Sequence, residues 1–435
     1  MTTTWSSGTT LTSPSYGNDQ KPEELIGKGF SFMDFLPQIR ESGGFFSEPV
    51  YETFRTLVDR ANAWLQANPQ WEIKTCESVE FKASRKEFDT QTMTYLEYGT
   101  TVNSYIRGLR LWLLQRPDKN STGQQIGYMN LKPHQTSNGG IFSSSTYESL
   151  QDVIDRFNAM IQTNPIPGRI ITIETQEMKM KGATDLDPDI SNWRERGDIR
   201  SRFLFVIRIF FEIMKGPSEE IGVVDFIPNT IKQGGIFSFP KYEPFSSVVG
   251  KASNWYAQQD KLRFCNAQSL EIKMKMGGDI DTQKMEYVEH GNRSTFYVRI
   301  LRVAYTKAPS QEQRLMREPL TMRQLTCKTF VPVQLTSGFF VPKFETLNET
   351  KTRVSAWVKA TGAQVFSAET TALRMFTGGE AKHGTEASFT YNREERSEYW
   401  IFVIRLYLNG KYEDPPPEML PPLPEYEDQQ CCIML

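Results

Sequence analysis

Two kinds of polar residue recur within apolar segments of the sequence. An arginine lies among aliphatic and aromatic residues four times, and a glutamate or glutamine lies on the inward side of a preceding alternating segment four times. These residues are Glu77 and Arg110, Glu174 and Arg208, Gln268 and Arg302, and Glu369 and Arg405. Because a buried charge without a partner costs much free energy, we expect each carboxylate or amide to pair with the arginine that follows it.

These repeated pairs have two interpretations. Their presence four times favours a structural role, in which each pair fixes the strand register or each arginine extends its charged end toward a surface. The functional alternative is an anion site built on arginine. The substitution Arg302→Leu separates the two, because intact stability with loss of ligand binding would indicate the anion site.

The other residue types that carry chemistry form no recognisable constellation. The three histidines, His134, His290 and His383, fall at unrelated places, and none has a Cys, Asp or His partner at metal-binding spacing. A phosphate-binding loop with its lysine is absent from the sequence. Acidic loops at 185–189 and 277–281 lack the final glutamate of a calcium loop, so we interpret them as solvated hairpins. The sequence therefore predicts no catalytic residue, metal site or cofactor.

Composition narrows the class of protein. The chain of 435 residues is 38% hydrophobic and 12% aromatic, which is typical of globular chains long enough for several domains. Its 50 basic and 52 acidic residues nearly cancel, so the chain has no excess of positive charge that would favour binding to nucleic acid. The five scattered cysteines favour a reducing compartment. The sequence shows neither a secretory signal nor an apolar run long enough to span a bilayer.

One phrase occurs four times. It reads Asp-Phe-Leu-Pro followed by Gly-Gly-Phe-Phe in the first copy, and an aromatic residue and a glutamate follow in every copy. The final phenylalanines are 96, 95 and 103 residues apart: Phe46, Phe142, Phe237 and Phe340. The aromatic–glutamate pairs are Tyr51-Glu52, Tyr147-Glu148, Tyr242-Glu243 and Phe344-Glu345. Such regular recurrence indicates four tandem copies of one module.

Each copy has the same pattern of periodicities. Apolar residues at three- and four-residue spacing after the phrase predict a helix, as at Phe54, Leu57, Val58 and Ala61. The stripe is weaker in the fourth copy, where Thr350 and Lys351 interrupt it. Alternating segments predict strands, and the last strand of each copy is apolar on both faces. We predict an α+β fold in which one helix covers an antiparallel sheet of about three or four strands in each module.

The doubly apolar last strand also predicts how the modules associate. Since the helix covers only one sheet face, the other face must meet a neighbouring module, so we expect four packed modules. The predicted division is a disordered segment at 1–27, modules at 28–115, 126–215, 221–307 and 325–410, an acidic Pro-rich spacer at 411–430 and a tail at 431–435.

The tail suggests a covalent modification. Cys432 is followed by Ile433, Met434 and Leu435. This segment resembles the CaaX box of prenylated proteins, and the resemblance implies geranylgeranylation of Cys432 because the final residue is leucine. One lipid gives weak membrane binding, and the acidic spacer would be repelled by anionic lipid. We therefore expect Cys431 to be palmitoylated as the second signal. The alternative is an unmodified tail on a soluble protein.

Together these features favour a non-enzymatic binding or scaffolding protein, anchored by its lipid to the cytoplasmic face of a membrane. We expect protein partners and no nucleic acid. The alternative is a small-ligand or lipid-binding protein, or an enzyme, that uses a pocket within or between modules. An enclosed cavity lined by polar residues that differ between copies would favour that alternative.

Overall fold

The computed structural model describes residues 29–426 with short gaps. The gaps are 44–48, 84–87, 98–100, 117–121, 139–144, 181–185, 196–198, 217, 236–238, 276–277, 290–294, 308–322, 337–341, 378–383 and 393–397. The predicted lipidation residues and most of the glycine–aromatic phrases lie outside the described residues.

The four copies predicted from the sequence are confirmed as structural repeats. Each contains one helix at its predicted place: α2 (Phe54–Ala67), α3 (Leu150–Thr163), α4 (Phe245–Tyr256) and α5 (Leu347–Thr361). Each also contains the predicted long apolar strand: β6 (Asn103–Gln115), β12 (Ser201–Ile213), β18 (Thr295–Lys307) and β24 (Glu398–Asn409). This long strand is the centre of each sheet.

Two strands of the same module flank each central strand, and all pairings are antiparallel. On one side lie β1 (Phe30–Phe35), β7 (Ile126–Leu131), β13 (Glu220–Phe226) and β19 (Leu325–Phe330). On the other side lie β4 (Trp71–Ala83), β10 (Gly168–Lys179), β16 (Leu262–Lys273) and β22 (Val365–Thr377). The four strands of this second group contact one another around a common axis.

The fourth strand of every sheet comes from a neighbouring module. These exchanged strands are β5 (Thr94–Glu97), β11 (Asn192–Glu195), β17 (Glu286–Glu289) and β23 (Phe389–Asn392). Strand β11 joins the first sheet, β17 the second and β23 the third. Strand β5 of the first module joins β24 in the last sheet, so the exchange closes a ring.

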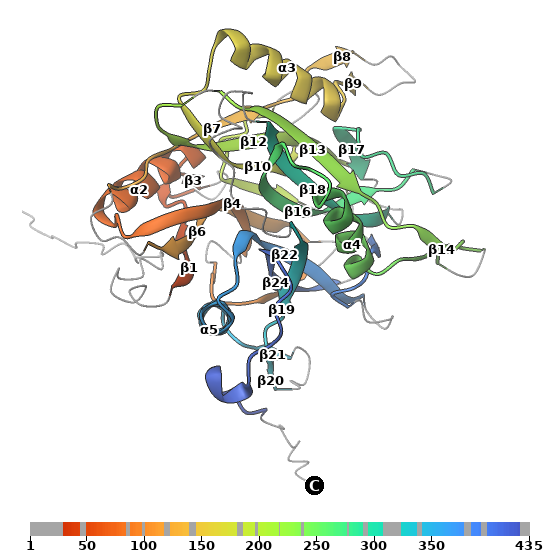
Figure 1. Ribbon diagram of the computed structural model, residues 1–435. Coiled ribbons are helices and arrows are strands. Elements are labelled where there is room, and N and C mark those ends of the chain that lie inside the picture. Colours follow the sequence, from red (N-terminus) through yellow and green to blue (C-terminus); the bar gives the residue numbers. More distant parts are fainter. Residues whose placement is uncertain are drawn as a thin grey trace, which may run out of the picture.

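The predicted α+β class is therefore wrong. Strands make up 50% of the described residues and helices 18%, and the four sheets are arranged as the blades of a four-bladed β-propeller. Figure 1 shows the helices at four places around the outside of this ring. Each helix packs on its own sheet and also on a strand of the next blade, so it does not complete a separate helix-on-sheet module. Each helix lies where two blades meet, because the second apolar face of each blade needs cover from its neighbour.

The junction between the fourth and first modules shows this packing. Helix α5 buries Val354 and Trp357 in one core with Phe30 and Phe32 of β1. Lys351, one of the polar residues that weaken its stripe, faces the same junction and lies 4.8 Å from the Phe32 ring centroid. Helix α5 is therefore less amphipathic because much of its surface contacts another module.

The first N–H of each helix also binds the next module. The main-chain N–H of Phe54 donates to the Asp189 carbonyl oxygen at 2.9 Å, and that of Leu347 donates to Gln91 at 2.9 Å. The corresponding bonds of α3 and α4 reach Gln283 and Glu386. Because these N–H groups have no partner within the helix, the neighbouring loop acts as a cap.

The recurring aromatic–glutamate pair belongs to a short hairpin before each helix. The hairpins are β2 (Ile39–Glu41) with β3 (Val50–Tyr51), β8 (Gln135–Ser137) with β9 (Thr146–Tyr147), β14 (Thr230–Lys232) with β15 (Lys241–Tyr242), and β20 (Gln334–Thr336) with β21 (Lys343–Phe344). Glu345 accepts from the Val333 N–H and pairs with Arg353 at 2.6 Å, and the other copies repeat this arrangement. The glutamate thus joins hairpin to helix.

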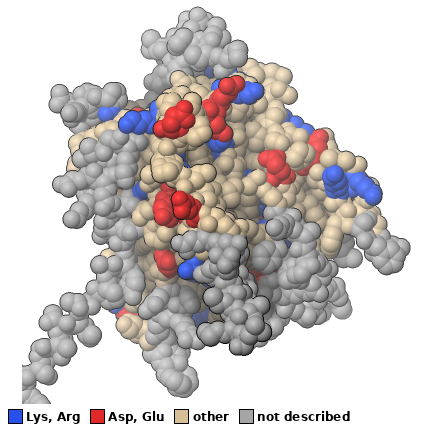
Figure 2. Space-filling view, turned by 90° about the horizontal axis from the view of Figure 1, so that it is seen from below, with Lys and Arg blue, Asp and Glu red and all other residues tan. Residues whose placement is uncertain are grey.

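The chain after the last blade turns back onto the fourth module. The Asp414 carboxylate accepts from the Trp357 indole and pairs with Lys328 at 2.6 Å, and a short 3-10 helix, η2, follows at Pro417–Met419. Among the described residues, no helix is long and apolar enough to cross a bilayer. On the face shown in Figure 2, acidic and basic side chains are scattered among uncharged residues.

Candidate binding cavity at the ring axis

The four axial strands are joined by a ring of side-chain to main-chain hydrogen bonds. Thr172 accepts from the N–H of Cys76 in the preceding module, at 2.9 Å. Asn266, Ser367 and Thr75 make the same bond to the preceding module, and Thr75 closes the ring onto Ala368. Each acceptor follows an irregularity in strand register, which frees an N–H from the sheet.

A second ring contains the glutamates and the glutamine predicted from the sequence. Glu174 accepts from both the N–H and the hydroxyl of Ser78, one module earlier. Glu369 makes the same two bonds to Ser269, and Gln268 exchanges two bonds with the Thr175 main chain. Glu77 accepts from the N–H of Thr370 and so closes this ring. These four side chains therefore form hydrogen bonds that join neighbouring modules.

The predicted arginine partners lie opposite these residues in register but bond mainly elsewhere. Glu77–Arg110, Glu174–Arg208, Gln268–Arg302 and Glu369–Arg405 are cross-strand neighbours in their sheets. The closest charged atoms are 4.0 Å apart in the second pair and 3.7 Å apart in the fourth. Arg110 instead makes two 2.6 Å bonds to Asp34, and Arg302 makes two 2.7 Å bonds to Asp225.

A hydroxyl group connects the two kinds of polar residue. The Arg208 guanidinium donates to Ser78 at 2.7 Å, and the same hydroxyl donates to Glu174. Arg110 donates to Thr370 at 2.7 Å, and Arg302 donates to Thr175 at 2.9 Å. The sequence contained this signal, because a Ser or Thr follows the Glu or Gln in all four copies.

The carboxylates are distributed so that every module can neutralise its buried arginine. The second and fourth modules have Glu174 and Glu369, whereas the third has a glutamine and relies on Asp225. The first module has both Asp34 and Glu77, one carboxylate more than its arginine needs. Burial raises the pKa of Glu77 to about 8, so this surplus carboxyl group is mainly protonated at neutral pH.

The axial strands line an open cavity of about 350 Å³, and residues of all four modules contribute to its lining. Its lining is mainly polar and differs between copies, with Glu80, Lys82, Glu177 and Glu271 among the charged residues. This volume lies within the range of small-molecule sites, roughly 300 to 1,000 Å³. The sequence could not locate it, because no single module contains it.

A dense polar layer lies near the cavity where the exchanged strands join the sheets. The Tyr105 hydroxyl binds Glu97, and the Tyr297 hydroxyl binds Glu289. Lys179 donates to the Arg194 carbonyl oxygen at 2.9 Å. Burial raises the pKa of Glu195 to about 8 and lowers the pKa of Lys179, because both charged forms lose hydration. The strand exchange itself therefore brings these titratable groups together.

The two predicted lipidation sites and one histidine without a predicted role remain to be located. Cys431 and Cys432 lie outside the described residues. His134 is exposed, with its Nδ1 3.5 Å from Glu148. Among the described residues, no three His, Cys, Asp or Glu side chains are placed to hold a metal ion.

Comparisons of the chain with protein-family models, with curated proteins and with solved structures find no match.

Proposed function

We propose that the protein is a non-enzymatic binding or scaffolding protein, held at the cytoplasmic face of a membrane by a lipid on Cys432. The observation that carries the scaffold part is the closed ring: each module supplies a strand to the preceding module and packs its helix at the junction with the next one. The four-fold propeller-like arrangement is consistent with a tandem-repeat scaffold. Such a ring presents four related outer surfaces on one body, which suits the assembly of protein partners.

The lipid tether is the more specific part of this proposal. Its support is the Cys432-Ile433-Met434-Leu435 sequence, with Cys431 available for a second acyl group. The intact mass of the native protein tests it directly. We expect a mass above that of the bare sequence, and we expect Cys432→Ser to move the protein from the membrane to the soluble fraction. Cys327→Ser is the matched control, since that thiol lies within a blade. A native mass equal to the bare sequence would remove the tether.

A second candidate function is the binding of a small ligand in the central cavity. The observation that favours it is the axial cavity of about 350 Å³, whose polar lining differs between copies. Small molecules that bind there should raise the melting temperature of the whole ring, because the cavity wall contains all four modules. A screen in which no small molecule raises the melting temperature would argue against this candidate.

A further inference from the structure

The charges lining the central cavity do not balance. The lining includes six glutamates and one lysine. Glu80 pairs with Arg107 at 2.8 Å, and Glu271 pairs with Arg299 at 2.6 Å. Glu174 and Glu369 lie 4.0 and 3.7 Å from their arginines, and Glu77 stands opposite Arg110, whose positive charge acts on it. Among the described residues, these assignments leave Glu177 as the lining carboxylate without an ion-pair partner.

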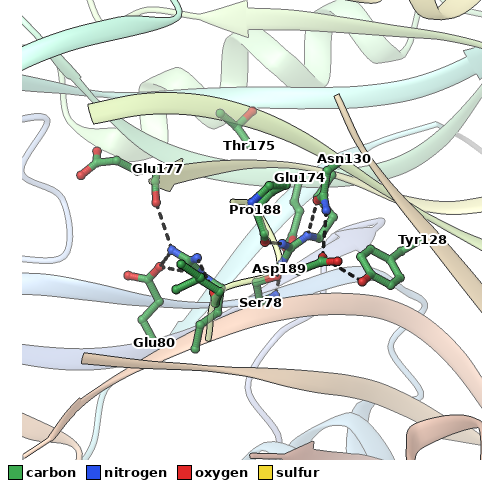
Figure 3. Close-up of polar contacts among 12 residues, drawn as sticks. Ser78, Glu80, Tyr128, Asn130, Glu174, Thr175, Glu177, Pro188 and Asp189 are labelled. Carbon is green, nitrogen blue, oxygen red and sulfur yellow. Dashed lines mark hydrogen bonds and ion pairs between the residues drawn. The ribbon is translucent and has the colours of Figure 1, made fainter. Parts of the chain in front are cut away.

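The absence of a partner follows from a change on the adjacent strand. Glu80 and Glu271 stand opposite Arg107 and Arg299, whereas the residue opposite Glu177 is Phe205. In Figure 3 the dashed line at Glu177 starts from its main-chain carbonyl, which accepts from Arg107 at 3.1 Å, while its carboxylate points away. The Glu177 side chain lines the cavity and contacts solvent there.

The groups that face Glu177 come from several elements. Tyr287 on β17 donates a hydrogen bond to its carboxylate, and Glu289, Glu195 and Glu80 add negative charge from β17, β11 and β4. Burial and these carboxylates raise the pKa of Glu177 well above its usual range. A cation bound beside Glu177 would relieve this repulsion.

We propose that the central cavity binds a small organic cation, with an ammonium group at the Glu177 carboxylate. This inference rests on the second candidate function, since it names the class of ligand for that cavity. Tyr95, Tyr105 and Phe402 line the same cavity and provide aromatic surface for the rest of the ligand. The lack of a three-ligand metal cluster among the described residues favours an organic cation.

The chain offers a matched pair of test positions. Ala372 lines the cavity on β22 and corresponds to Glu177, and the residue opposite it is again a phenylalanine, Phe402. Glu177→Gln removes the unpaired charge, whereas Ala372→Glu adds a second one. Asp155→Asn on the exposed face of α3 removes a carboxylate of the same module outside the cavity.

Isothermal titration of the full chain with 1,4-diaminobutane and benzylamine, beside their neutral analogues 1,4-butanediol and benzyl alcohol, tests the proposal. We expect at least one ammonium compound to bind with 1:1 stoichiometry and at least 10-fold more tightly than its neutral analogue. Glu177→Gln should weaken binding at least 10-fold, Ala372→Glu should strengthen it, and Asp155→Asn should leave it unchanged. Because binding favours the ionised carboxylate and the pKa of Glu177 is raised, affinity should rise as pH increases above the ordinary range of a glutamate in the native chain, less so in Glu177→Gln.

The outcomes distinguish the cation assignment from the ligand-binding function on which it rests. If the neutral analogues bind as tightly as the amines, the cavity is a ligand site and the cation assignment is wrong. If neither class binds at millimolar concentration, the cation assignment fails and the ligand-binding function loses its support. If Glu177→Gln does not fold, an unchanged affinity in Ala372→Glu is sufficient to overturn the cation assignment.

Discussion

The Glu77 carboxylate accepts a hydrogen bond from the main-chain N–H of Thr370, a residue 293 positions later in the chain. This bond joins the first module to the last and completes a ring of four equivalent contacts around the axis. The same junction contains the exchanged strand β5 and the packing of α5 on β1. Ring closure therefore depends on contacts between the two ends of the repeat array.

Glu77→Gln should flatten the dependence of stability on pH. The folded-state pKa of Glu77, about 8, is above the ordinary value of 4.5, so the folded state holds its proton more tightly than the unfolded state. Stability from this group is therefore fully present below pH 4.5 and is lost as pH rises toward 8. Between pH 6 and 9 we expect the free energy of unfolding to fall by on the order of 2 kcal/mol more in the native chain than in Glu77→Gln.

Urea unfolding across this pH range measures the difference. The Trp112 indole donates to Glu77 at 2.7 Å, and the amide nitrogen of a glutamine cannot accept this bond. The variant should therefore be less stable than the native chain at pH 6. The slope with pH is consequently the decisive quantity. Parallel pH profiles for the two proteins would show that Glu77 does not titrate in this range.

Ser78→Ala should destabilise the contact between the first and second modules. The Ser78 hydroxyl accepts from Arg208 and donates to Glu174, and all three residues are buried. Its removal leaves a donor and an acceptor without their shared partner, which costs about 2 kcal/mol. Ser137→Ala, on an exposed hairpin, should change stability by less than about 0.5 kcal/mol. Equal unfolding midpoints for the two variants would argue against the hydroxyl link.

Arg302→Leu should destabilise the third module strongly. The side chain of Arg302 is 4% exposed, and its substitution leaves the Asp225 carboxylate buried without its two bonds. We expect a loss of about 3–5 kcal/mol in the free energy of unfolding. The double variant Asp225→Leu/Arg302→Leu should recover much of it, because no charge then remains unpaired. An Arg302→Leu protein as stable as the native chain would instead support an anion site at this arginine.

The local elements of this fold are readable from the sequence because periodicity reports which faces are buried. The stripe from Phe54 to Leu65 predicted α2, and the doubly apolar segments predicted the central strands. The overall class was not readable. Strand β5 has no feature that distinguishes pairing with its own sheet from pairing with β24, and that choice is what converts separate modules into a ring.

The contacts of the polar residues could likewise be predicted only in part. The recurrence of Glu174 and Arg208 identified two buried groups that lie opposite each other in register. The bridging hydroxyl comes from Ser78 in another module, and a pattern within one copy cannot reveal a contact between copies. Asp34 and Asp225 were visible in the repeated phrase, but their neutral counterparts Asn130 and Thr329 concealed their role as arginine partners.

Disulfide trapping across the β5–β24 pair tests ring closure most directly. Tyr95 and Trp400 are cross-strand neighbours with stacked rings 6.1 Å apart, although they are 305 positions apart in the chain. In a background in which Cys431 and Cys432 are serine, the double variant Tyr95→Cys/Trp400→Cys should form an intramolecular disulfide on mild oxidation, detected as a faster-migrating monomer on a non-reducing gel. Each single variant should show no shift. A double variant that stays reduced, or that forms only dimers, would contradict the closed ring.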